Sequence, residues 1–364
     1  DLEGTILKRA NLQGAILSGA SLGRTDFSDA NLSGADLSGA DLAGAILTGA
    51  NLAEAKLIGA SLEGAVLDGA LLTKADLSDA DLNGASLQRA DLADAVLAGT
   101  ILSDARLTDA RLDRADLTES QIRNAMLTGT TCADADLGGA DLTGAHLGGC
   151  DLRGARLQGA DLSRATLARV QAQKAVLPEA EMSESNLCEA DFTLADLAGA
   201  VLTGCSGPGA KFDRAILTSV TGDGADLSAA VFRGAYANDA RFEGSNFAGA
   251  VFDDLNAEGA AFDNADLTGA SARKANFRGS SFACANLDFV KFKDCDLAGA
   301  DLTGSSRNQA EFLGCLMTEE QPPADKDDLE RNRITPDLSG FFPSRRLAAT
   351  GQDRKALLKD FETP

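Results

Sequence analysis

The stretch "SGADLSGADLAGAILTGANLAEA", residues 33–55, repeats an alanine, a mostly polar residue and a leucine every five positions. An α-helix places side chains on one face with a period of 3.6 residues, and a β-strand does so with a period of two. A period of five fits neither structure. The segment therefore requires a different periodic backbone that brings every leucine to an equivalent environment.

The same repeat continues in both directions without a change of register. From Leu2 to Met317, positions ending in 2 or 7 are mostly Leu and then Phe, while positions ending in 0 or 5 are mostly Ala. No insertion or deletion interrupts the series. Such regularity predicts a solenoid in which each unit packs only on its neighbours. Leu142 and Leu152 stand at the central position of their units, which predicts that both side chains are buried.

Units such as "ADLSG", "ANLSG" and "ADLTG" resemble the A(D/N)LXX motif of the pentapeptide repeat family. The resemblance covers residues 1–317 and implies an all-β fold, a right-handed quadrilateral β-helix. In that fold each quintet forms one side of a square, and four quintets form a coil. The resemblance thus implies about sixteen coils, with residues 1–317 as the β-helix and 318–364 as a separate tail.

The phenylalanine spacing independently indicates twenty residues per coil. Several Phe residues in the second half differ by multiples of twenty, so they would share one inner wall, with Ala172 and Ala272 on the same wall. At the spacing of neighbouring strands their rings would form a ladder of offset stacks. Positions ten apart would lie on opposite sides of a coil, where dense packing favours pairs of large and small side chains. The wall residues are Phe192, Phe212, Phe232, Phe252, Phe292 and Phe312.

The positions around each central residue have predictable roles. Asp and Asn just before it would point outward, and Asn11, Asn31 and Asn51 could form a short hydrogen-bonded ladder. Gly two positions after it suggests a tight corner with positive φ. Residues 203–224 depart from the pattern, because Gly207 and Gly222 replace Leu. There we expect two weakened corners that tolerate a bulge or slight bend, with a hinge at Gly207–Pro208 as the alternative.

The last 47 residues leave the repeat. Pro322 and Pro323 would stop the solenoid, and residues 323–333 and 351–361 read as short helices. A β-helix exposes unpaired backbone at its ends, which invites association. We expect the tail to cap that end, with Phe341 and Phe342 covering it. Docking of a partner, or of a second copy to form a homodimer, is the alternative.

The bulk composition narrows the classes of function. The net charge is −22, which argues against direct nucleic-acid binding, since phosphate contacts need a basic face. No apolar run approaches eighteen residues and no signal-peptide core begins the chain, so we expect no membrane segment and a bacterial cytoplasmic location. A secretion-associated context stays open. The chain begins within a quintet and without Met, which suggests a piece of a longer protein.

Chemically reactive groups are few. His146 is the single histidine and points outward, and no catalytic, phosphate-binding or metal-binding motif occurs. We expect the acidic residues to be spread around the rod and interspersed with Arg, as on a solvated surface. We therefore expect no enzyme activity, no cofactor and no metal. Cys295 and Cys315 lie twenty apart, within disulfide distance, but are expected to pack as small apolar groups. The same holds for the other central or corner thiols, Cys132, Cys150 and Cys205.

Two functions follow from these features. The first is a rod-like protein–protein interaction or scaffold module of a larger bacterial protein, with Tyr236 and Phe289 as candidate surface anchors. The second comes from the resemblance, since some family members imitate DNA and bind DNA gyrase or topoisomerase IV. The array carries 45 acidic and 25 basic residues. Over a rod of ~75 Å this is one net charge per ~4 Å, whereas duplex DNA carries one per ~1.7 Å. The scaffold therefore ranks first.

Overall fold

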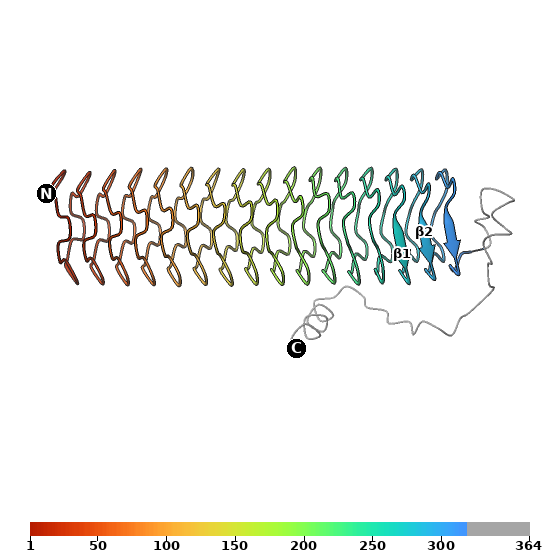
Figure 1. Cartoon of the computed structure of the whole chain (residues 1–364), viewed down its shortest axis with the longest axis horizontal. Coiled ribbons are helices and arrows are strands. Elements are labelled where there is room, and N and C mark those ends of the chain that lie inside the picture. The colour runs from red at the N-terminus through yellow and green to blue at the C-terminus, as the bar shows by residue number, and fades with distance from the viewer. Residues whose placement is uncertain (319–364) are drawn as a thin grey trace, which may run out of the picture.

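The computed structural model describes residues 1–318, which form a straight rod of stacked coils (Figure 1). The N-terminus lies at one end of the rod and the last described coil at the other. Several predictions concern the tail. They are its boundary with the array, its two helices, its capping role and the candidate residues Phe341 and Phe342. Those residues, from 319 onward, lie outside the described part of the chain.

Each coil contains twenty residues. Parallel bridges join every outward position to the residue twenty later, from Ile6 with Asp26 to Asp296 with Leu316. Near the C-terminal end the pairing lengthens into three short strands. These strands, β1 (Ser271–Arg273), β2 (Lys291–Lys293) and β3 (Glu311–Leu313), form one parallel sheet in that order. Residues 1–318 contain no helix, and thus none that could cross a membrane.

The coil has four sides, here called faces A to D. Face A comprises the units centred on Leu2 and every twentieth residue after it. Faces B, C and D are centred in the same way on Leu7, Leu12 and Leu17. Going around one coil, the chain passes from A to D and then enters face A of the next coil. Faces D and A are therefore neighbours, and a residue's number alone assigns its face.

Backbone hydrogen bonds connect each coil to the next. The Leu142 N–H donates to the carbonyl of Asp161 at 2.7 Å, and the Asp161 N–H donates back to the carbonyl of Ala140 at 3.0 Å. Within one unit, the Ala145 N–H closes a turn on the Leu142 carbonyl at 2.9 Å. This pattern recurs along the rod. Because each unit contacts only adjacent coils, stability accumulates from neighbour terms.

The second residue after each central one adopts the left-handed conformation. At every such position from Gly4 to Gly314, φ lies between 54° and 73°. The corner geometry predicted from glycine is therefore observed. Glycine is not obligatory, however, because Asp, Arg, Glu and Lys occupy many of these corners. Each non-glycine corner costs about 1–2 kcal/mol of backbone strain, which the surrounding ladder of hydrogen bonds must offset.

Replacing Gly64 by valine tests the corner strain without a steric clash. A β-carbon added at Gly64 would meet no atom within 4 Å, and φ there is 61°. A β-branched residue is poorly tolerated at this φ, so we expect a loss of about 1–2 kcal/mol. Thermal unfolding of Gly64→Val and of Glu63→Val, its exposed neighbour, measures the difference. Equal stability of the two variants would contradict the assigned corner strain.

The core is a column of leucines that becomes aromatic toward the C-terminus. Leu142 and Leu152 are 0% and 1% exposed. Along face C, the rings of Phe192, Phe212, Phe232 and Phe252 stack with centroid distances of 5.5, 5.0 and 5.4 Å. The predicted wall therefore exists.

The ladder continues past the small residue on the same wall. Ala272 lies between Phe252 and Phe292 in the face C column. Phe277, from face D, fills the gap with its ring 6.3 Å from Phe252 and 5.4 Å from Phe292, stacked on the latter. Phe312 follows at 5.6 Å from Phe292. A neighbouring face thus supplies the ring that Ala272 omits.

Two coils depart from the expected pairing of large and small residues. In one, Phe282 lies opposite Phe292, and in the other three rings are buried together. Phe242, Phe247 and Phe252 are consecutive central residues, all at most 2% exposed, and Phe242 lies opposite Phe252. Phe247 meets the other two edge-on at 5.1 and 5.6 Å. The expected pairing of a large with a small residue at positions ten apart is wrong for Phe242 and Phe252. Phe247 does lie opposite Ala237 as predicted, and this small residue helps make room for the third ring.

The two central glycines cause no bulge. The Gly207 N–H bonds the Asp226 carbonyl and the Gly222 N–H bonds the Arg241 carbonyl, each at 2.7 Å, as a central residue normally does. The predicted bulge is therefore wrong. At Gly222 the reason is volume, since a β-carbon would lie 2.7 Å from ring carbons of Phe242. The phenylalanine of the next coil occupies the space that a side chain would need.

Candidate functional site

The outward side chains form an ordered lattice. The Asp or Asn that begins a unit commonly accepts a hydrogen bond from the N–H two residues later, as Asp141 does from Thr143 at 3.0 Å. Two hydrogen bonds from Ser28 hold the pKa of Asp26 below its usual value. The bond from the Ser28 hydroxyl has the larger effect, and the bond from its N–H the smaller. These bonds fix side-chain direction at regular intervals along each face, so the polar surface is ordered before any partner arrives.

Amide side chains also connect coils. Asn31 donates to Asn11, and Asn51 donates to Asn31, each at 3.4 Å. The ladder predicted from the sequence is therefore present, although its bonds are long. A shorter link of 2.9 Å joins Asn276 to Asn256 on face D.

The charges are not evenly distributed around the rod. Face A carries 14 acidic and 4 basic residues, and face D carries 11 and 3. Face B carries 8 and 6, and face C carries 12 of each. Acidic residues thus occur on all four faces, as expected, but most of the basic residues that offset them lie on faces B and C. Since faces D and A adjoin, the net negative charge forms one continuous acidic side, while face C is neutral.

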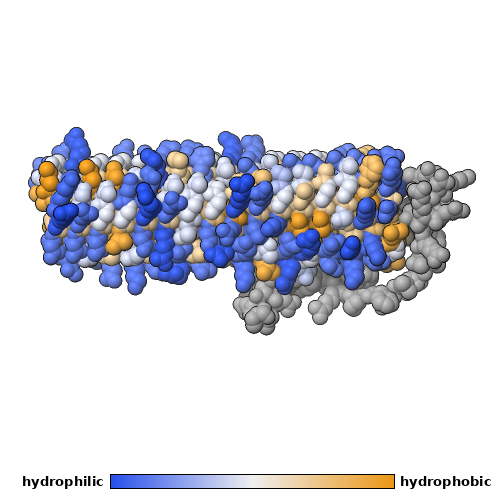
Figure 2. All heavy atoms as spheres, viewed as in Figure 1, coloured by the Kyte–Doolittle hydropathy of each residue, from blue (hydrophilic) through white to orange (hydrophobic). Residues whose placement is uncertain are grey.

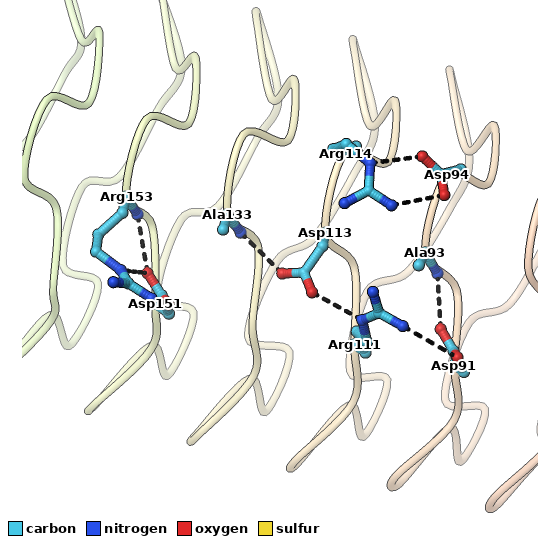
Figure 3. Close-up of polar contacts among 9 residues, drawn as sticks. All are labelled: Asp91, Ala93, Asp94, Arg111, Asp113, Arg114, Ala133, Asp151 and Arg153. Carbon is cyan, nitrogen blue, oxygen red and sulfur yellow. Dashed lines mark hydrogen bonds and ion pairs between the residues drawn. The ribbon is translucent and has the colours of Figure 1, made fainter.

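Face C is neutral because its acidic and basic residues are equal in number, and several of its cations pair with carboxylates across coils (Figure 3). Arg114 makes two hydrogen bonds to Asp94, both 2.7 Å long. Arg111 contacts Asp113 of its own unit at 2.8 Å and Asp91 of the preceding coil at 3.4 Å. The hydrogen bond from Arg114 holds the pKa of Asp94 below its usual value. Exposed pairs of this kind each contribute little to stability, but they lock the side chains in position.

The candidate apolar anchors lie on different faces. Phe289 on face B is 48% exposed and adopts the left-handed corner conformation, with φ 60°. Tyr236 on face D is half-buried, and Ile216, its partner in the preceding coil, is 3% exposed. The structure does not bring the two aromatic residues together. On the side seen in Figure 2 most of the surface is hydrophilic, and apolar residues form only small groups.

The single histidine and the thiols form no reactive cluster in the described part of the chain. His146 is exposed on face B, and residues 1–318 contain no group of His, Cys, Asp and Glu that could hold a metal ion. Cys295 and Cys315 are buried and not linked to each other. Cys150 donates to the Leu127 carbonyl at 2.7 Å, and burial raises its pKa to about 12. Thr130 makes the equivalent bond to the Leu107 carbonyl at 2.8 Å. The buried polar corner residues are thus structural.

Thiol labelling at pH 8 should distinguish two classes of cysteine. Cys284 is exposed and Cys188 half-exposed, whereas the other five thiols are buried. Burial raises the pKa of Cys150 and Cys205 to about 12, so neither is a thiolate at this pH. We expect an aromatic disulfide reagent to label Cys284 first, then Cys188, and all seven only after denaturation. Rapid labelling of all seven in the folded protein would contradict the assigned burial.

A five-residue unit, a twenty-residue coil and a core of stacked central residues define a solenoid repeat protein. Two family profiles, both described as pentapeptide repeats, match most of the array. The chain therefore belongs to the pentapeptide repeat family, and its coils form the right-handed β-helix of that family. The matched residues are 1–34, 35–73, 50–89, 90–129, 130–168, 167–204 and 260–299 for one profile and 227–271 for the other.

Several solved structures are similar to this chain. HetL, involved in heterocyst differentiation regulation in the cyanobacterium Nostoc sp. strain PCC 7120, is 28% identical, with 68% of this chain and 91% of HetL covered and a TM-score of 0.26. QnrB1, a plasmid-mediated fluoroquinolone resistance protein, is 20% identical, with 59% and 91% covered and a TM-score of 0.33. Rfr23 from the cyanobacterium Cyanothece 51142 is 36% identical, with 25% and 58% covered and a TM-score of 0.19. No curated protein matches this chain in sequence.

Proposed function

We propose that the chain is a non-enzymatic rod, of about sixteen coils and ~75 Å in length, that binds protein partners along its faces. The observation that carries this proposal is the ordered lattice of outward side chains. Binding normally costs about 0.5–1.5 kcal/mol for each long side chain that becomes immobilised. Side chains such as Asp141 and Arg114 are already held by hydrogen bonds, so much of that cost is met on folding.

The charge distribution supports a partner with a basic surface on the acidic side of the rod. Faces A and D together carry 25 acidic and 7 basic residues. Complementary electrostatic potentials on two protein surfaces speed their association and disfavour partners of like charge. The free thiols suit the reducing cytoplasm, which we propose as the location. The absence of enzyme activity belongs to the same proposal and is supported by the structural use of the buried polar groups.

Face-specific charge removal tests this function. In one variant Asp141, Asp161, Glu181 and Glu184 of face A become amides, which keep the oxygen acceptors of the lattice. A control variant changes Glu189, Asp226, Asp266 and Asp288 of face B in the same way. We expect partners captured from a bacterial extract to be lost with the face A variant and retained with the control. Capture of the same proteins by both variants would contradict recognition by the acidic side.

Imitation of DNA is the second candidate, because the net negative charge gathers on one side of the rod as such a function requires. The magnitude of the charge argues against it. Faces A and D together carry a net charge of −18. Along ~75 Å this still gives one charge per ~4 Å, less than half the ~1.7 Å density of duplex DNA. DNA gyrase therefore stays the alternative partner, and a general protein-binding rod ranks first.

A further inference from the structure

A shallow hollow of about 370 Å³ lies at the C-terminal end of face C, over β1, β2 and β3. It is lined by four cations, Arg233, Arg273, Lys291 and Lys293, and by the exposed Leu313. The strands beneath it are the only segments of residues 1–318 in which three consecutive residues pair with an adjacent coil. The backbone is therefore extended directly below the cations.

Three of the four cations of this hollow lack the ion pairs to the preceding coil that other cations of face C make. Outside the hollow, Arg114 contacts Asp94 and Lys211 contacts Asp191 of the preceding coil, and within it Arg233 contacts Asp213. Lys293 instead lies in register with Arg273. Within residues 1–318 neither Arg273, Lys291 nor Lys293 makes an ion pair.

Like charges in register on adjacent strands repel each other. Strands spaced at ~4.8 Å place Arg273 and Lys293 close together, in a protein whose net charge is −22. Such a pair is stabilised when an anion lies between or above the two cations. The unusual register of cations therefore points to a bound anionic group.

We propose that this hollow binds a short, extended acidic peptide segment of a partner protein. Three coil steps separate Arg233 from Lys293, or ~14 Å, the length of about four extended residues. Two or three carboxylates of such a segment would meet the cations. An apolar side chain of the segment would pack on Leu313, which is 41% exposed and lies in register with Lys293 of the preceding coil. This inference rests on the proposed protein-binding function and names one surface and its partner chemistry.

The surroundings favour a peptide over a nucleic acid. Asp253 and Glu311 border the hollow and would oppose a polyanion that continues beyond it. The neighbouring face D carries 11 acidic and 3 basic residues, so a longer phosphate backbone would be repelled. The exposed apolar surface of Leu313 suits a peptide side chain.

Fluorescence anisotropy with the full chain tests the proposal. The probe is a labelled peptide, acetyl-Gly-Glu-Leu-Asp-Glu-Gly-amide, with its Gln/Asn analogue as the uncharged control. The double variant Arg273→Glu and Lys293→Glu should weaken binding of the acidic peptide at least tenfold. The matched double variant Lys74→Glu and Lys174→Glu changes two cations of face C outside the hollow, and should change the affinity by less than twofold.

Three results would overturn the proposal. They are no binding of the acidic peptide by the native chain, equal weakening by both double variants, and tighter binding of a twelve-nucleotide single strand than of the peptide. The outcome is separable from that of the face A capture experiment, because the hollow lies on face C. Capture lost with the face A variant, together with no peptide binding, would remove this site and leave the rod's protein-binding function standing.

Discussion

Replacing Leu142 by aspartate is expected to unfold the middle of the rod. Leu142 is 0% exposed and lies between Ile122 and Leu162 of the adjacent coils, both also 0% exposed. The change removes a buried side chain, which costs about 2–5 kcal/mol, and leaves a carboxylate without a partner in an apolar column. Together these effects should exceed about 5 kcal/mol. Because coils are stabilised by their neighbours, the loss should spread to the adjacent coils.

A nearby outward substitution provides the matched control for Leu142→Asp. His146 lies four residues later on an exposed position, so His146→Asp introduces the same carboxylate into water. We expect its stability to lie within about 0.5 kcal/mol of the native protein. Circular dichroism melting and limited proteolysis compare the two variants. Similar melting temperatures for both would contradict the assignment of inward and outward positions.

The second large effect is expected at Gly222. A β-carbon there would lie 2.7 Å from the Cδ1 and Cε1 atoms of Phe242, so Gly222→Leu forces a large side chain into occupied space. Overpacking of this kind costs about 1–3 kcal/mol and sometimes more. Leucine is the consensus residue at this position, so the usual expectation from the repeat would be stabilisation. The structure predicts the opposite sign.

A second substitution should rescue this variant. Shortening Phe242 to leucine removes the ring and restores the ordinary stacking of leucine on leucine. The double variant Gly222→Leu and Phe242→Leu should therefore be more stable than Gly222→Leu alone, with a coupling energy on the order of 2 kcal/mol. Chemical denaturation of the native chain and the three variants measures this energy. Strictly additive effects would show that the ring and the glycine do not share one space.

The repeat made the inward columns predictable because one side-chain position recurs every five residues without interruption. Phenylalanines at multiples of twenty then fixed the length of the coil, and Leu142 and Phe192 lie where that arithmetic places them. How side chains fill the space at individual core positions was harder to predict. Phe277 enters the gap beside Ala272 from another face, and Phe242 fills the space above Gly222. Such compensation depends on ring orientation, which the repeat alone does not specify.

The surface was predicted less completely than the core. Outward Asp and Asn were expected, but their bonds to the N–H two residues later depend on the turn geometry of each unit. The acidic side emerges only when each charge is assigned to one of four faces, because along the chain arginines such as Arg111 and Arg114 stand between the acids. Predicting the hollow would require knowing that Arg273 lies in register with Lys293 and that open space remains beside Ser271. No short sequence motif predicts such a combination.

The most direct test measures supercoiling by DNA gyrase with increasing amounts of the full chain, at low and at moderate salt. It shows whether the rod acts through complementary protein-binding faces or by imitating the electrostatic field of DNA. A DNA mimic would inhibit strongly at low salt and lose that inhibition steeply as salt rises, in competition with duplex DNA. With less than half the charge density of DNA, the chain is expected to leave supercoiling unchanged at protein concentrations around ~1 μM at either salt. Salt-sensitive inhibition at nanomolar to low-micromolar protein would contradict the account and make gyrase the leading partner.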